Sequence, residues 1–420
     1  MHERLVEFGG QGVRVRRLGR TRAGEIRITR FLRNPAVRVS EIVEAAAART
    51  CKRVGGRHVL AIQDTTTVRG EAKGRCIALH PVIAVDAVDA TLLGLIDARF
   101  FIRKGGQRKK RKAKVFKKKE SCRWLEGAES AAALAVAGAA QVTVVADREG
   151  DIYEDFACKP ESVEVLIRAG QDRRLVDGSL LFTKAGTLPE AGRMTVQLAA
   201  APGRPAREAV LALRFCEVEI ARPVSRGPTA EIKALPSSVT LRLVEARECH
   251  PPSGAPAAHW RLLTTHNVGD VADARRIVGF YRERWTIEQL FRTLKTQGFD
   301  VEALRLADGG PFENLVAASV VAAVTVLQLV RERDGMGKRP LEDALDADDR
   351  PALEAVCTTL EGKTARQKNP HARGSLAFAA WVFARLGGWT GYYGKPGPVV
   401  MLSGLVQFHA IKHGWTLRNV

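Results

Sequence analysis

Short apolar runs bounded by turn residues recur along the first two thirds of the chain and predict a β-sheet. HVLAIQ at His58–Gln63 and VTVVA at Val142–Ala146 are apolar over nearly their whole length, which is typical of strands buried on both faces. Residues 77–87 and 91–102 are strand-like and joined by a short turn, so together with His58–Gln63 they predict an antiparallel meander. Val163–Arg168 predicts a further short strand.

Helical segments alternate with these strands. Val39–Thr50 predicts a helix with Ser40 as its N-cap, and Glu120–Gly138 is an Ala-rich helical segment that lies between two strands. This alternation is an α/β pattern with a mixed sheet. Residues 169–259 are rich in Pro and Gly and predict a β-rich insertion, after which WRLLTT at Trp260–Thr265 resumes the α/β pattern. The C-terminal region is Ala-rich and predicted to be helical.

YRERWTIEQLFRTLK at Tyr281–Lys295 predicts one amphipathic helix. One face of this helix packs on the core, and the opposite face carries a carboxylate among cations. The apolar positions are Ile287, Leu290, Phe291 and Leu294. The polar positions are Tyr281, Arg284, Glu288 and Lys295, with Trp285 and Arg292 at the edges. The alternative is a solvated face on which Glu288 and Arg292 form an i,i+4 ion pair.

The composition indicates that the chain binds a polyanionic partner. The chain has 420 residues, enough for two or three domains, and a formal net charge of +20. Such a charge favours nucleic acid over a membrane as the partner. Seven cysteines without a CxxC pair argue against a disulfide framework and for a reduced, cytoplasmic compartment. The N-terminus has no apolar signal segment, and the apolar run Asn314–Val330 predicts a buried helix, so we expect no membrane association.

The densest positive charge lies in RKGGQRKKRKAKVFKKK at Arg103–Lys119, which has eleven Lys or Arg residues and no acid. We interpret this run as a loop that follows a phosphate backbone, and a solvated charge run is the alternative. The DNA contacts expected at its centre are Lys109, Lys110, Arg111 and Lys112.

Three carboxylates stand out by position. Asp64 and Asp147 each follow an apolar strand, and Glu288 lies on the polar side of the predicted late helix. Carboxylate oxygens suit Mg²⁺, and two such ions can stabilise the attacking and leaving oxygens of a phosphodiester. Tyr281, Arg284 and Lys295 beside Glu288 are then expected to donate to phosphate oxygens.

These residues resemble the signatures of one enzyme family. The spacing of Tyr281, Arg284, Glu288 and Lys295 is similar to the Y-(2)-R-(3)-E-(6)-K signature of insertion sequence 4 family DDE transposases. QDTT at Gln63–Thr66 resembles the first aspartate motif of that family, and DREGDIYE, which begins at Asp147, resembles the second. FLRNPAV, ESCRWLEG, WRLLTT and LGGW…GKPGP also resemble family segments in the same order, so the resemblance covers about residues 30–415.

The resemblance implies an α/β fold with an RNase H-like mixed-sheet catalytic core, a β-rich insertion and an α-helical C-terminal region. It implies that Asp64, Asp147 and Glu288 bind two Mg²⁺ ions, for which Mn²⁺ can substitute, and that Tyr281, Arg284, Arg292 and Lys295 bind DNA. The expected divisions are a short basic DNA-binding region at 1–55, the first part of the core at 56–168, the insertion at 169–258, the end of the core at 259–300 and a dimerising helical region at 301–420.

The implied reaction is metal-dependent cut-and-paste transposition in a bacterial cell. It comprises strand nicking, formation and opening of a hairpin at the transposon end, and strand transfer. The implied partners are double-stranded DNA with terminal inverted repeats, target DNA and a second copy of the chain. Trp260 resembles the family tryptophan that stabilises a flipped base, and stacking suits an indole. A core tryptophan is the alternative reading of Trp260.

Two other functions stay open from the sequence. Only about thirty Arg-rich residues precede FLRNPAV, fewer than in relatives, so a truncated or catalytically impaired transposase that still binds DNA is one alternative. A basic RNA-binding protein is the other, although it would need neither the strand-end aspartates nor the clustered polar residues of Tyr281–Lys295.

Overall fold

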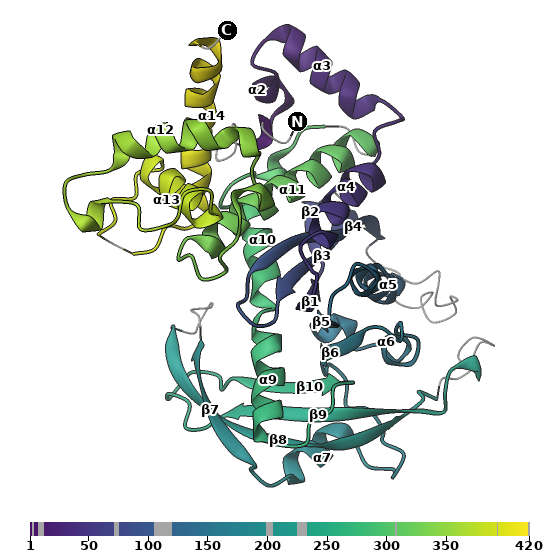
Figure 1. The fold of residues 1–420 in the computed structure, drawn as a ribbon. Coiled ribbons are helices and arrows are strands. Elements are labelled where there is room, and N and C mark those ends of the chain that lie inside the picture. Colours follow the sequence, from purple (N-terminus) through teal and green to yellow (C-terminus); the bar gives the residue numbers. More distant parts are fainter. Residues whose placement is uncertain are drawn as a thin grey trace. The chain divides into compact units, whose positions relative to one another are not determined.

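The computed structural model describes residues 1, 4–6, 12–70, 75–104, 120–198, 205–224, 233–306, 309–392 and 394–418 (Figure 1). The chain forms two compact units. Unit 1 comprises Met1–Gly55, Thr65–Gly106 and Thr286–Val420, and unit 2 comprises Gly56–Asp64 and Gln107–Trp285.

Unit 2 is built on a mixed sheet in which the strands follow the order β1, β5, β6, β10, β9, β8 and β7. The neighbours β1/β5 and β5/β6 are parallel, and every later neighbouring pair is antiparallel. The strands are β1 His58–Gln63, β5 Gln141–Ala146, β6 Glu164–Arg168, β7 Gly192–Leu198, β8 Arg207–Ala221, β9 Ser238–Glu248 and β10 His259–Thr264. β1 and β5 are buried over almost their full length, which explains their continuous apolar sequences.

The helices of unit 2 pack on this sheet. Helix α5 (Cys122–Val136) packs on β1 and β5 through an Ala-rich face that allows close approach, and α9 (Val271–Arg282) packs on β6, β8 and β9. Two short helices, α6 (Tyr153–Ala157) and α7 (Leu181–Thr187), lie in the connections between strands. The sequence therefore predicted the α/β core and the β-rich character of residues 169–258 correctly.

Unit 1 combines three antiparallel strands with most of the helices. Its strands are β2 (Thr66–Gly70), β3 (Arg75–Asp86) and β4 (Leu92–Lys104), and β3 pairs with both others. The predicted hairpin of residues 77–87 and 91–102 is thus confirmed, whereas β2 was not predicted. β1, the first strand of the predicted meander, belongs to unit 2.

The core of unit 1 forms around α11 (Gly310–Glu332), which contacts α3, α4, α13, α14 and β4. This helix is long and apolar enough to cross a membrane, but 94% of its most apolar window is buried inside the protein, as expected for a core helix. The other helices are α2 Val15–Gly19, α3 Arg22–Arg33, α4 Val39–Cys51, α10 Trp285–Lys295, α12 Arg350–Leu360, α13 Leu376–Leu386 and α14 Pro398–Arg418.

Two predictions about helix ends were wrong. The N-cap of α4 is Arg38 and not Ser40, and no side chain caps this helix. Tyr281–Lys295 is not one helix, because α9 ends at Arg282 and α10 begins at Trp285. Tyr281 therefore belongs to α9, and Arg284 lies in the turn between the two helices.

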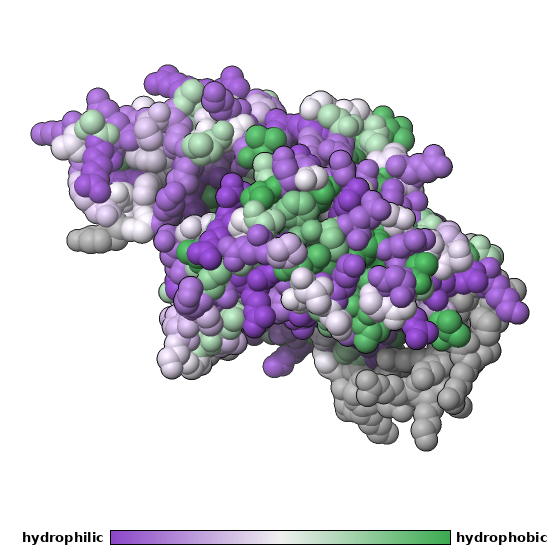
Figure 2. Space-filling model, turned by 90° about the horizontal axis from the view of Figure 1, so that it is seen from below, coloured by the Kyte–Doolittle hydropathy of each residue, from purple (hydrophilic) through white to green (hydrophobic). Residues whose placement is uncertain are grey.

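The surface agrees with the high charge of the chain. On the face drawn in Figure 2, hydrophilic side chains cover much of the surface and apolar side chains form smaller patches among them. All seven cysteines are free, as the absence of a CxxC pattern predicted.

Candidate active site

Asp64 and Asp147 follow neighbouring parallel strands at equivalent positions. In the β1/β5 ladder Ile62 pairs with Val145, and each aspartate comes two residues after its member of that pair. The carboxyl ends of parallel strands meet at one edge of a sheet, so the register places the two aspartates side by side there. The sequence pattern of an apolar strand followed by Asp predicted this location in both cases.

A tight turn fixes the side chain of Asp147. Its Oδ1 accepts a hydrogen bond of 2.8 Å from the backbone N–H of Glu149 in the 3-10 helix η4 (Arg148–Gly150). A Cβ on Gly150 would lie 2.7 Å from Cβ of Ala146 and 3.2 Å from the ring of Trp124, so only glycine lets this turn pack on α5. Oδ2 of Asp147 has no hydrogen-bond partner in the described part of the chain and is available to a ligand.

Asp64 is held by a cation. Nη1 of Arg284 donates a hydrogen bond of 3.0 Å to Oδ2 of Asp64, and each of the two side chains is only 16% exposed. The guanidinium of Arg284 also lies 5.9 Å from the ring centroid of Tyr281. The turn between α9 and α10 therefore directs Arg284 toward the strand-end aspartates.

Tyr281 is buried, with 5% of its surface exposed, and its hydroxyl hydrogen-bonds with Arg168. Burial raises the pKa of Tyr281, so the hydroxyl stays protonated and can donate a hydrogen bond at neutral pH. Arg168 follows Ile167, which pairs with Ala146 of β5, so Arg168 comes next to Asp147 across the β5/β6 ladder. Burial is also the main cause that lowers the pKa of Arg168.

Arg168 is the residue that sequence reasoning missed. It occupies the last position of the apolar strand β6. A charged residue at the end of an apolar strand is the same signal that located Asp64 and Asp147, and it could have identified Arg168 as well. Nη2 of Arg168 also donates a hydrogen bond of 3.0 Å to the backbone carbonyl of His259, which holds the guanidinium at the strand end.

Trp260 lies on β10 and is half-buried. Its ring centroid is 6.0 Å from that of Tyr281, with an angle of 60° between the ring planes. Within unit 2 the structure thus brings together Asp64, Asp147, Arg168, Trp260, Tyr281 and Arg284.

Glu288, Arg292 and Lys295 lie on α10 in unit 1. Ile287, Leu290 and Leu294 are buried as predicted, and Phe291 is only half-buried. Glu288 is half-buried, Arg292 is exposed, and Nζ of Lys295 lies 2.8 Å from Oε1 of Glu302. The amphipathic prediction therefore holds for α10, although Lys295 has a carboxylate partner of its own.

A comparison with protein-family models decides the family. The transposase DDE domain model matches residues 79–324, more than half of the chain. The chain belongs to this transposase family. The matched segment contains Asp147, Arg168, Trp260, Tyr281, Arg284 and Glu288, and it begins after Asp64. The DDE domain has an RNase H-like fold, in agreement with the mixed sheet of unit 2.

DDE transposases use divalent metal ions, and the donor set of this transposase fits such an ion. Asp64 and Asp147 supply carboxylate oxygens, the ligands that hard divalent cations prefer. Among the residues that the structure describes, no group of three His, Cys, Asp or Glu side chains is gathered into a metal site. Asp64 and Asp147 lie side by side in unit 2, and metal binding by this pair stays a prediction.

Most of the lysine run, residues 105–119, lies outside the described residues. This applies to the four expected DNA contacts Lys109, Lys110, Arg111 and Lys112, whose role stays a prediction.

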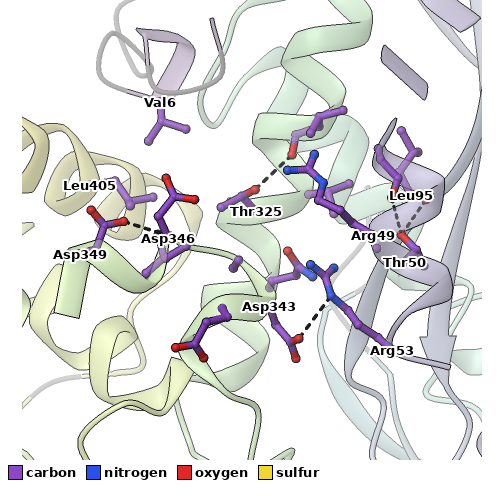
Figure 3. A pocket seen from close by; sticks show the side chains of 18 of the residues that line it. Val6, Arg49, Thr50, Arg53, Leu95, Thr325, Asp343, Asp346, Asp349 and Leu405 are labelled. Atoms are coloured by element: carbon purple, nitrogen blue, oxygen red, sulfur yellow. Dashed lines mark hydrogen bonds and ion pairs between the residues drawn. The ribbon is translucent and has the colours of Figure 1, made fainter. Parts of the chain in front are cut away.

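A cavity of about 160 Å³ in unit 1 is a different feature (Figure 3). Some of its charged side chains are in ion pairs: Arg53 lies 3.3 Å from Asp343, and Lys412 lies 2.6 Å from the buried Asp349. Its lining includes none of the predicted catalytic carboxylates. Its lining includes the acids Glu342, Asp343, Asp346 and Asp349, which suit an anionic phosphodiester poorly, so we do not assign it to the reaction of the transposase.

Proposed function

We propose that this transposase performs cut-and-paste transposition in the manner of the insertion sequence 4 family, with Asp64, Asp147 and Glu288 as its catalytic carboxylates. The observation that carries the proposal is the register of β1 and β5, which sets Asp64 and Asp147 next to each other at one sheet edge. Two divalent ions, Mg²⁺ or Mn²⁺, would supply Lewis acidity to the attacking and leaving oxygens of the phosphodiester. Glu288 would supply the third carboxylate.

The residues around the aspartates suit a phosphodiester substrate. Arg284 and Tyr281 present hydrogen-bond donors beside Asp64 and Asp147, and such donors hold phosphate oxygens in line for displacement. Arg292, Lys295 and the lysine run would extend this contact along the DNA backbone. These contacts are independent of base sequence, so recognition of the terminal repeats would come from other parts of the chain.

The proposed reaction comprises first-strand nicking, hairpin formation and opening at the transposon end, and strand transfer into target DNA. The proposed organisation assigns end binding to residues 1–55, the catalytic core to 56–168 and 259–300, the β-rich insertion to 169–258 and dimerisation to 301–420. The substrates are duplex DNA with terminal inverted repeats and target DNA, which a homodimer would bring together.

The test uses a duplex that carries one of the inverted repeats bracketing the gene. Asp64→Asn, Asp147→Asn and Glu288→Gln should each lower nicking in Mg²⁺ by at least about a thousandfold while duplex affinity changes by less than about threefold. Glu161→Gln, at an exposed acid of unit 2, is the matched control and should nick at the wild-type rate.

Two outcomes would contradict the proposal. Equal losses of binding and nicking in the three variants would assign these carboxylates to folding. A wild-type protein that binds the duplex in the presence of Mg²⁺ or Mn²⁺ without nicking it would be the catalytically impaired DNA-binding remnant.

A further inference from the structure

The ion pair between Arg284 and Asp64 places a cation of the protein on a proposed metal ligand. Nη1 of Arg284 is 3.0 Å from Oδ2 of Asp64, and both side chains are largely sheltered from water. Attraction between opposite charges is stronger in such a site than on an open surface, so this contact competes with other cations for the carboxylate. Asp147 differs, because its Oδ2 has no partner in the described part of the chain.

The position of Arg284 is set independently of this ion pair. Its backbone N–H donates a hydrogen bond of 3.1 Å to the carbonyl of Tyr281, and its guanidinium lies over the Tyr281 ring. The backbone is thus anchored to the end of α9, while the long side chain can change partner without moving the helix. Arg284 can therefore reach a different anion close to the same place.

We propose that Arg284 is an internal counter-ion of Asp64 that couples metal loading to DNA binding; this inference rests on the proposed function. Without DNA, the guanidinium neutralises Asp64 and weakens its binding of a divalent cation. A DNA phosphate next to the site offers the guanidinium a second anionic partner, with which it can form two parallel hydrogen bonds. Arg284 then leaves Asp64, and the carboxylate becomes available to the metal.

Thermodynamic linkage predicts the direction in which DNA and metal change each other's affinity. If DNA raises metal affinity by drawing Arg284 away from Asp64, the metal must raise DNA affinity by the same factor. The catalytic metal site would therefore be occupied mainly when DNA is bound. The metal-loaded aspartates would then contact a phosphodiester and not bulk solvent.

The experiment titrates Mn²⁺ into the full chain by isothermal calorimetry, first without DNA. Arg284→Gln should bind Mn²⁺ at least about fivefold more tightly than the wild type. The matched control is Arg282→Gln, which removes an exposed cation two residues away at the last position of α9 and should stay close to the wild type. If Arg284→Gln binds no more tightly than Arg282→Gln, the counter-ion role is wrong.

The second arm uses the wild-type protein and so does not depend on whether a variant folds. A saturating random-sequence duplex should tighten Mn²⁺ binding by the wild type at least about fivefold, after subtraction of a titration of the duplex alone. The duplex should have little effect on Mn²⁺ binding by Arg284→Gln. An unchanged Mn²⁺ affinity of the wild type on adding the duplex would overturn the coupling.

Asp64→Asn separates failure of this inference from failure of the proposed function. If, with the saturating duplex bound, Asp64→Asn binds Mn²⁺ as well as the wild type does, the metal site is not at Asp64 and the proposed function fails with it. If Asp64→Asn loses Mn²⁺ binding on the duplex while Arg284→Gln without DNA binds Mn²⁺ no more tightly than the wild type, the metal site stands and only the role of Arg284 is wrong.

Discussion

The indole of Trp260 lies against the ring of Tyr281, which itself hydrogen-bonds with Arg168 beside the strand-end aspartates. Trp260 is half-buried, whereas Tyr281 is 5% exposed. One part of the indole therefore packs on the protein and another part can be reached from solvent. A tryptophan that served only to fill the core would be buried like Trp124, which is 1% exposed.

This position leads to a prediction about the hairpin step. A hairpin bends one strand back across the duplex end, so a base must leave the stack at a cost of a few kcal/mol that an aromatic surface can partly offset. The first nick needs no such distortion. Trp260→Ala should therefore nick the first strand at nearly the wild-type rate and form at least about tenfold less hairpin, as measured on end-labelled duplexes by denaturing gels.

Trp260→Phe is the control, because it keeps an aromatic face and should retain most of the hairpin product. An abasic nucleotide at the flipped position should restore part of the hairpin formed by Trp260→Ala. If nicking and hairpin formation fall together, or if Trp260→Ala no longer unfolds cooperatively, Trp260 is a core residue and has no role in stacking a base.

The elements that the sequence predicted best are those whose pattern is local. The strands β1 and β5 are continuous apolar runs of strand length, and a single acid directly after each run located Asp64 and Asp147. Burial on both faces of a parallel strand demands this pattern, so no knowledge of the tertiary structure is needed to recognise it. The Ala-rich sequence of α5 likewise predicted a helix from a local pattern.

The features that the sequence could not show depend on contacts between distant residues. No Pro or Gly marks the break between α9 and α10, and the ion pair that Arg284 makes there joins residues 220 positions apart. Arg168 could not be linked to Tyr281 without the register of β6 against β5. The prediction from the periodicity of Tyr281–Lys295 required one continuous helix, and it therefore placed Tyr281 on the same polar face as Glu288.

The buried His266 predicts a loss of stability in acid. Nε2 of His266 and Nε2 of His58 each lie 2.8 Å from Oγ1 of Thr143, so one hydroxyl serves two imidazole rings. Burial lowers the pKa of His266 to about 4, from the 6.5 expected in an unfolded chain. Because the unfolded chain binds the proton more tightly, stability is lost as the pH falls from about 6.5 toward 4.

His266→Gln should remove much of this pH dependence. The pKa difference corresponds to about 3 kcal/mol of unfolding free energy between pH 7 and pH 4. Urea denaturation of the variant should therefore show a smaller decrease over this interval than the wild type does. His413→Gln, at an exposed histidine, is the control and should keep the wild-type slope. Parallel curves for His266→Gln and the wild type would mean that His266 does not remain neutral in the fold.

Asp155 on α6 predicts a pH dependence of the opposite sign. It is 4% exposed, and neither of its carboxylate oxygens has a hydrogen-bond partner in the described part of the chain. Burial is the main cause that raises the pKa of Asp155 well above its ordinary value, and the neighbouring Glu154 adds to this effect. The unfolded chain therefore releases the proton at lower pH than the folded protein, and stability is lost as the pH rises from about 4 toward the raised pKa of the fold.

Asp155→Asn replaces this acid with a neutral side chain of nearly the same shape, so it should stabilise the protein where the wild type is disfavoured by ionisation. We expect the free energy of unfolding of Asp155→Asn to exceed that of the wild type by at least about 1 kcal/mol at pH 8, and the gain to disappear near pH 4. Urea denaturation at the two pH values measures the difference, with Glu161→Gln as an exposed control that should follow the wild type at both. A difference between the variant and the wild type that is the same at pH 8 and pH 4 would show that ionisation of Asp155 does not lower the stability of the wild type.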